Sequence, residues 1–84
     1  GMLFDYNRPQ KVTMWMKNTL IPLDMVFIDA TGIVVHISER AVPQSHKTIS
    51  SRVSVRAVLE LNGGTVARLK IKIGDRIQHT IFRG

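Results

Sequence analysis

The sequence predicts an all-β fold, a small antiparallel β-barrel or sandwich with one short helical turn. Apolar and polar residues alternate along several runs, and short connections that contain glycine separate these runs. Such alternation is typical of strands, because successive side chains of a strand point to opposite faces of the sheet. Only the stretch "VARLK" favours a helical turn.

The first alternating runs cover residues 12–17 and 23–28, and both predict strands. The connection 29–32, from aspartate to glycine, leads directly into the β-branched run 33–38. A connection this short joins neighbouring strands in a hairpin. The first sheet is therefore expected to be antiparallel.

A long polar segment, residues 39–51, follows this hairpin. It contains Pro43 and lacks sustained periodicity, so it predicts a surface loop of the kind that often carries function. The strongest strand is expected next, over residues 52–62. Its core face would carry Val53, Val55, Ala57, Leu59 and Leu61, and its wet face Arg52, Ser54, Arg56 and Glu60.

The remaining residues predict a helical turn and a last strand. Thr65 follows a glycine pair and can cap a short helix over residues 66–70 by accepting a hydrogen bond from a backbone N–H. Gly74 and Asp75 indicate a tight turn, and residues 77–82 are expected to form the final strand.

Length and composition indicate a single domain over residues 1–84. A chain of this size buries roughly 60 to 65% of its unfolded surface, which leaves room for one small core. The absence of cysteine excludes disulfides, a thiolate nucleophile and a zinc site of cysteine type. No apolar run approaches the roughly 18 residues of a membrane span, and the start lacks the regions of a signal peptide. We therefore expect a soluble protein.

The net charge of +6 is unevenly distributed. Up to Glu39 three basic residues face four acidic ones, whereas from Arg40 onward nine basic residues face only Glu60 and Asp75. A basic surface of this kind can bind nucleic acid, although a solvated basic face is the commoner cause. Nucleic-acid binding through the second half is therefore an alternative, and not the leading, function.

The strongest candidate site lies in the most apolar region, in "MWMKNTLIPLD". Here Trp15 would supply a flat apolar wall, Lys17 an anion contact, and Asn18 and Asp24 orienting hydrogen bonds, with Thr19 in the turn between them. These residues predict a non-catalytic binding module for a small polar or anionic ligand, or for a segment of a partner. The structural alternative is that they only shape and tie a turn while Trp15 plugs the end of the barrel.

Asp24 permits a second function. It is expected on a core face, where its carboxylate stays ionised only beside a partner such as Lys17 or backbone N–H groups. Burial and a charged neighbour move pKa values toward working pH, so an enzyme using Asp24 and Lys17 as an acid–base pair is the catalytic alternative. A single carboxylate and a single amine are weak grounds for it.

The long loop contributes further candidates, Pro43, Ser45 and His46. Ser45 and His46 are adjacent, but a nucleophile needs a base and an orienting group whose proximity adjacent positions do not establish. A metal site is not expected, because no close pair of side chains has ligand spacing, and no cofactor is indicated. The scattered groups that such a site would need are His36, His46, Asp24, Asp29 and Glu39.

With these elements in place, "MWMKNTLIPLD" resembles the signature of the family called domain of unknown function 192. The resemblance continues through "MVFID" and "GIVVHI", through Ala41, Pro43 and Ser45, and then through "VLEL", the glycine pair and "IGD". It covers nearly the whole chain and corresponds to the C-terminal major part of the family's domain. It implies a bacterial or archaeal all-β domain without an established activity.

Two departures from the family pattern bear on these expectations. Members usually have a further segment ahead of "GMLF", so the chain is expected to lack the N-terminal segment of the family. Members also often have glycine and proline where this chain has Lys70 and Ile73. Because the family often follows an export signal, the resemblance favours an exported or periplasmic location if an upstream signal peptide was removed.

Overall fold

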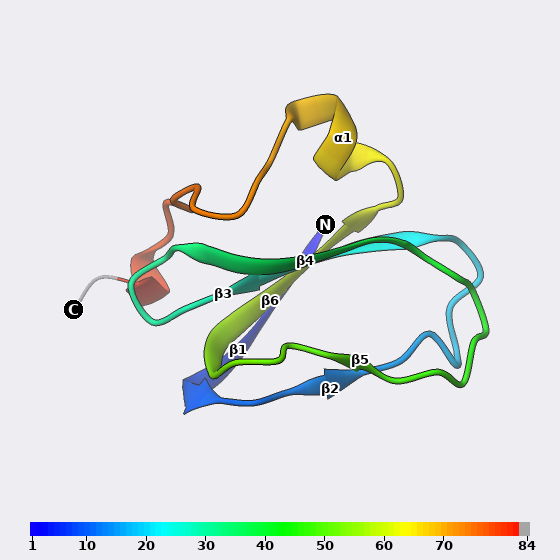
Figure 1. Cartoon of the computed structure of the whole chain (residues 1–84), viewed down its shortest axis with the longest axis horizontal. Helices are drawn as coiled ribbons and strands as arrows, with labels where there is room; N and C mark the ends of the chain where they lie inside the picture. Colours follow the sequence, from blue (N-terminus) through cyan, green and yellow to red (C-terminus); the bar gives the residue numbers. More distant parts are fainter. Residues whose placement is uncertain (83–84) are drawn as a thin grey trace.

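The computed structural model describes residues 1–82 and contains two antiparallel sheets (Figure 1). The larger sheet has four strands in the order β1-β6-β3-β4, and the smaller is a two-stranded ribbon of β2 and β5. One short helix, α1, follows β6, and a 3-10 turn, η1, ends the described chain. The bounds are β1 Met2–Gln10, β2 Thr13–Met14, β3 Leu23–Ile28, β4 Val34–Ala41, β5 Ile49–Ser50, β6 Val55–Asn62, α1 Thr65–Leu69 and η1 Thr80–Phe82.

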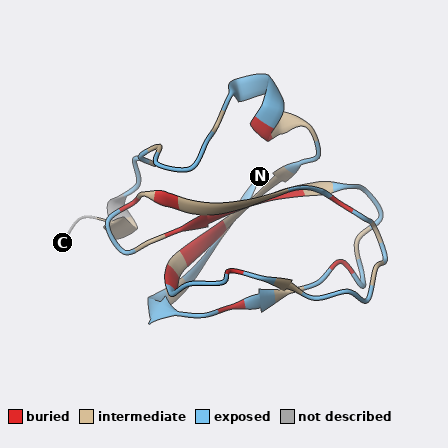
Figure 2. Cartoon of the chain, in the orientation of Figure 1, coloured by how far each residue is buried: buried red, intermediate tan, exposed pale blue. Residues whose placement is uncertain are grey.

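Strand β3 lies between β4 and β6 and is the centre of the larger sheet. It pairs with β6 over all six residues, from Leu23 opposite Asn62 to Ile28 opposite Ala57. Its pairing with β4 is less regular, because the register shifts near each end of the strand. With both edges paired and five of its six residues buried, β3 anchors the fold (Figure 2).

Two apolar clusters cover the two faces of the larger sheet. Met25 and Phe27 of β3 pack toward the β2–β5 ribbon, together with Met16, which lies just beyond β2. Val26 and Ile28 alternate with them and face the other side. The first cluster contains Val12, Met16, Met25, Phe27, Ala41, Val55 and Val58, and the second contains Val26, Ile28, Val34 and Val66.

The predicted all-β class and the first hairpin are confirmed. Residues 29–32 connect β3 to β4, and the two strands pair antiparallel. The turn is closed by Asp29, whose Oδ1 accepts hydrogen bonds from the N–H groups of Thr31, at 2.9 Å, and of Ile33, at 3.0 Å. Within residues 1–82 the larger sheet does not close into a barrel, since β1 and β4 remain its two edges.

The prediction for the first strands is partly wrong. The expected strand over residues 12–17 pairs only at Thr13 and Met14, and its partner β5 lies inside the segment expected to be a loop. The longest strand, β1, was not predicted at all. Pro9 and the positive φ of Asn7, 67°, interrupt its pattern, and β1 is tied to the sheet along one edge only.

The expectation of a wet face on β6 is also wrong. The strand begins at Val55, and Val53, expected in the core, is 46% exposed. Val58, which alternation placed between core positions, is fully buried in the first cluster. Val55 and Val58 belong to the first cluster, whereas Leu59 and Leu61 pack against the second, so apolar side chains lie on both faces of β6.

Two predictions near the C-terminus are wrong. Thr65 does not cap the helix: the N-cap position is Gly64, with a φ of 93° and no side-chain hydrogen bond. The expected strand over residues 77–82 is not formed. An isolated bridge between Ile33 and Arg76 holds this segment against the start of β4, and the chain then turns into η1.

Candidate functional site

Asp24 is fully buried in β3 and accepts hydrogen bonds from two distant backbone groups. Its Oδ1 accepts from the N–H of Arg40 at 2.8 Å, and its Oδ2 accepts from the N–H of Val66 at 2.8 Å. Burial acts to raise the pKa of this carboxyl and is the largest single influence, but backbone hydrogen bonds from Val66, Arg40 and Gly64 outweigh it and hold the pKa below its usual value. Asp24 is thus an ionised acceptor that ties β4 and α1 to β3.

Alternation along β3 separates Asp24 from the rest of the predicted site. Asp24 faces the side that carries Val26 and Val66, whereas Met16, beside Trp15 and Lys17, packs on the opposite side of the sheet. Of the two kinds of partner expected for Asp24, backbone N–H groups are the ones present. A carboxylate with no exposed surface and both oxygens engaged has no access to a substrate, so the geometry does not favour Asp24 as a general base.

Trp15, Lys17 and His46 come together at one end of the molecule. The Lys17 Nζ lies 5.1 Å from the centroid of the Trp15 ring, and the His46 ring lies 6.2 Å from it. Trp15 is 52% exposed, so it does not plug the end of a barrel. The contact between Trp15 and His46 joins the loop after β2 to the loop after β4, although the two residues are some thirty positions apart in the sequence.

Asn18 and Thr19 shape the turn that follows Lys17. Both the N–H and the hydroxyl of Thr19 donate to the carbonyl oxygen of Met16, at 3.2 and 3.0 Å. Asn18 is exposed in the same turn. The structure therefore gives Thr19 a local structural role and leaves the Asn18 side chain accessible.

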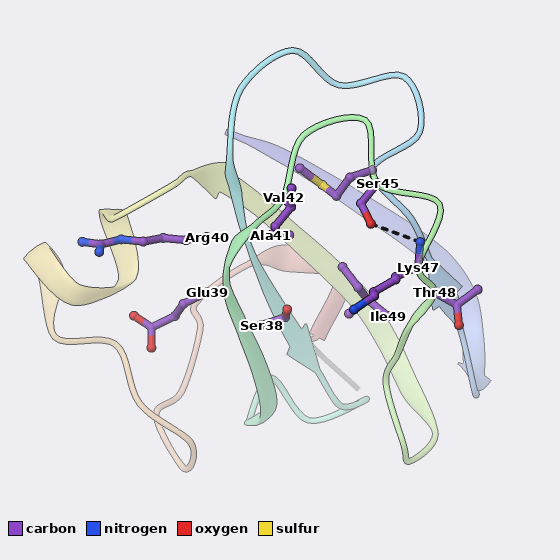
Figure 3. Close-up of a pocket in the computed structure, with 10 residues that line it drawn as sticks. Ser38, Glu39, Arg40, Ala41, Val42, Ser45, Lys47, Thr48 and Ile49 are labelled. Carbon is purple, nitrogen blue, oxygen red and sulfur yellow. Dashed lines mark hydrogen bonds between the residues drawn. The ribbon is translucent and has the colours of Figure 1, made fainter.

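A cavity of about 310 Å³ opens between the end of β4 and the chain that returns to β5 (Figure 3). Met16 and Ile49 supply apolar surface and Lys47 supplies positive charge, whereas the Arg40 side chain points away from the cavity, with its guanidinium beside Gly64 (Figure 3). The hydroxyl groups of Ser38, Ser45 and Thr48 add hydrogen-bonding capacity. The full lining is Met16, Ser38, Glu39, Arg40, Ala41, Val42, Ser45, Lys47, Thr48 and Ile49.

The loop that walls this cavity holds its own shape through short-range hydrogen bonds. The N–H of Ser45 donates to the carbonyl oxygen of Val42 at 3.3 Å, and the Ser45 Oγ accepts from the N–H of Lys47 at 3.1 Å (Figure 3). Gln44, which lies between Val42 and Ser45, has a φ of 60°. Ser45 therefore helps to position the backbone that carries Lys47.

The loop expected to carry function lines the cavity, but the residues singled out in the sequence make only part of the lining. Ser45 lines the cavity, and His46 contacts Trp15 nearby, but Pro43 is not among the lining residues. Arg40 and Lys47, the two basic residues of the lining, were not singled out. Their position in a long polar loop was the available signal. Only the fold brings this loop beside the apolar Met16.

The histidines show no arrangement typical of a metal centre. His36 lies in β4 beside Phe27, with ring centroids 5.4 Å apart. His79, expected in a strand, is exposed and lies before η1. In the part of the chain that the structure describes, no three histidine, aspartate or glutamate side chains are grouped closely enough to hold a metal ion.

The fold and the cavity define a small antiparallel β-domain with a loop-lined candidate site. A family model, DUF192, described as "Uncharacterized ACR", matches residues 1–79. The chain belongs to this family. The comparison with curated proteins gives no significant match. No helix in residues 1–82 is long and apolar enough to cross a membrane.

Two solved structures are similar to this chain. One, from Sinorhizobium meliloti 1021, is described as a "putative transcription regulator", is 55% identical and superposes with a TM-score of 0.89. The other, a protein of unknown function from Novosphingobium aromaticivorans DSM 12444, is 42% identical with the same TM-score of 0.89. The similarity covers 90% and 93% of this chain but only 59% and 56% of those chains.

Proposed function

We propose that this domain is a non-catalytic binding module, and that the cavity between β4 and β5 holds a small anionic ligand. The observation that carries the proposal is that Lys47 and the hydroxyl-bearing Ser38, Ser45 and Thr48 line one cavity with an apolar floor. Small-ligand sites combine apolar walls with a few polar groups that fix orientation. Lys47 suits a carboxylate or phosphate because its ammonium group can donate charge-assisted hydrogen bonds to their oxygens.

Trp15 and Lys17 belong to the rim of this site. The His46 ring near Trp15 follows Ser45, which lines the cavity, so the rim and the cavity share one loop. A ligand longer than the cavity would extend toward the exposed Trp15 ring and the Lys17 ammonium group. We assign Asp24 to the scaffold of the site, because it fixes the backbone of Arg40.

Titration calorimetry against inorganic phosphate and a panel of small mono- and dicarboxylates tests this proposal. We expect binding by the wild type, at least about tenfold weaker binding by Lys47→Ala, which loses a charge-assisted contact, and a smaller loss in Arg40→Gln, whose guanidinium points away from the cavity (Figure 3). Lys72→Ala is the matched control, because this exposed lysine pairs with Asp75, away from the cavity. Equal affinity of all four proteins, or no binding to any of these anions, would contradict the proposal.

Nucleic-acid binding is a second candidate, supported by the net charge of +6 and by the printed description of the Sinorhizobium meliloti structure. Contacts to phosphates release counterions, so affinity that rests on them falls steeply with salt. We expect binding of a DNA duplex, if it occurs, to weaken about 10³-fold or more between low and moderate salt when several phosphates are contacted. Affinity independent of salt would exclude this candidate.

A further inference from the structure

Two neighbouring loops expose large apolar side chains at one end of the molecule. The loop after β2 presents Leu20, 82% exposed, and Ile21, 51% exposed, and the loop after β4 presents Val42, 66% exposed. Trp15, 52% exposed, begins the loop after β2, and its ring lies near that of His46 in the loop after β4. The loops lie together in Figure 1, on the right. We call Trp15, Leu20, Ile21 and Val42 the loop-end surface.

A positive charge lies within this apolar surface. In residues 15–22 the only charged side chain is Lys17, whose ammonium group lies over the Trp15 ring. In residues 39–48 Arg40 and Lys47 outnumber Glu39. Soluble proteins rarely gather exposed apolar side chains without a use, and such a patch marks an interaction surface.

The composition of the loop-end surface fits a lipid surface. Aliphatic side chains at loop ends can enter the boundary between headgroups and acyl chains. A tryptophan ring is favoured at that boundary, and a lysine can place its stem in apolar surroundings while its ammonium group stays among headgroups. Each cation near an anionic membrane adds electrostatic attraction.

We propose that the loop-end surface docks on an anionic lipid membrane. Leu20 and Ile21 enter the acyl boundary, Trp15 lies at headgroup level, and Lys17 contacts an anionic headgroup. Apolar insertion and charge act together, because either one alone gives marginal binding. This surface adjoins the cavity and shares Val42 with its lining, but the proposal depends on the exposed apolar side chains and not on the small-ligand function.

The test uses phosphatidylcholine vesicles with and without one third phosphatidylglycerol. We expect the protein to sediment with the anionic vesicles, to be released by salt, and to show a blue-shifted emission of Trp15, the only tryptophan. Leu20→Asp should lower the apparent affinity by about tenfold or more, because it places a charge where an apolar group must enter. The matched control is Ile73→Asp, since Ile73 is 62% exposed on the segment after α1.

Four results would overturn the proposal. Equal loss in Leu20→Asp and Ile73→Asp would show that added negative charge, and not its position, weakens binding. Sedimentation without a blue shift would show diffuse attraction by the basic surface. Release by inorganic phosphate at matched ionic strength would place the headgroup in the cavity. An absence of binding to anionic vesicles would leave a protein segment as the occupant of the loop-end surface.

Discussion

Asp24 joins three elements through one buried carboxylate. It accepts hydrogen bonds from the N–H groups of Arg40 and Val66, so it fixes the end of β4 and the start of α1. In Asp24→Asn one acceptor becomes a donor that faces a backbone N–H, and we expect a cost of about 1 to 3 kcal/mol. Urea denaturation measures it. Lys17→Ala, at an exposed position, should be nearly neutral, and a large loss there would contradict this division of roles.

The same carboxylate gives stability a defined pH dependence. Because backbone hydrogen bonds hold the pKa of Asp24 below its unfolded value despite burial, its stabilising contribution is present above about pH 4 and is lost as the pH falls through the folded pKa. Asp24→Asn should therefore flatten the acid limb of the stability curve. An acid limb unchanged in the variant would contradict the assignment of Asp24 as an ionised acceptor.

Glu60 should show the opposite behaviour. Burial raises the pKa of this half-buried carboxyl, so its ionisation weakens the fold as the pH rises through the folded pKa. Glu60→Gln is expected to stabilise the protein at neutral pH and to have little effect below about pH 4. Melting curves at both pH values make the comparison, and a larger effect at the acidic pH would be inconsistent with burial as the cause.

Ser51, like Asp24, is a fully buried polar side chain, and it joins the two chain segments at one end of the β2–β5 ribbon. Its Oγ accepts from the N–H of Val12 at 3.1 Å and donates to the carbonyl oxygen of Val53 at 2.7 Å. Ser51→Ala leaves both backbone groups without this partner, at an expected cost of about 1 to 3 kcal/mol. Thermal denaturation should show almost no change for Ser54→Ala, the exposed control, and an equal shift in both would argue against the buried bridge.

At the scale of elements, the sequence pattern predicted those strands and turns that contacts between neighbouring residues determine. The hairpin of β3 and β4 was predicted because alternation and a four-residue connection are both visible in the sequence. The helix was also predicted, but not its cap, since the Asp24 carboxylate that binds its first turn lies 42 residues away. The alternation of residues 77–82 failed for a related reason: the segment is held by the bridge at Arg76 and turns inward, without a sheet edge along its length.

Helix α1 ends at a residue with an unfavourable backbone conformation. Lys70 has a φ of 57° and a ψ of 37°, while its N–H donates to Ala67 and the N–H of Ile71 donates to Val66. This is the left-handed helix ending that favours glycine. Lys70→Gly should stabilise the protein by about 1 kcal/mol, as measured by the denaturation midpoint. Lys72→Gly serves as the control, and a gain there of similar size would show that removal of charge is responsible.

At the scale of the whole molecule, the candidate site depends on contacts that the sequence does not reveal. The segment around Trp15 and Lys17 was predicted, as was a functional loop near Ser45 and His46. These segments meet at one end and form the cavity there because Met16 and Ala41 pack in one apolar cluster with Met25 and Phe27 of β3. Nearness in the sequence grouped Asp24 with the site, whereas the sheet places it on the opposite face.

The central strand makes the two clusters parts of one cooperative unit. Phe27 lies in the first cluster, and its neighbours Val26 and Ile28 lie in the second, so loss of either cluster disturbs the other. Phe27→Ala should cost about 3 to 5 kcal/mol, a large share of the roughly 4 to 13 kcal/mol expected for a chain of this length. Phe4→Ala, at a position 36% exposed on the edge strand, should cost much less.

In both variants the fluorescence of Trp15, beside the small ribbon, and the far-UV circular dichroism of the sheets should change at the same urea concentration. Coincident transitions are expected because Met16 packs directly on Phe27's cluster, so the ribbon has no apolar core apart from the larger sheet. An earlier transition of Trp15 alone would show that the end of the molecule carrying the cavity and the loop-end surface unfolds separately. The site would then be a mobile appendage of the sheet, and not a rigid part of the domain.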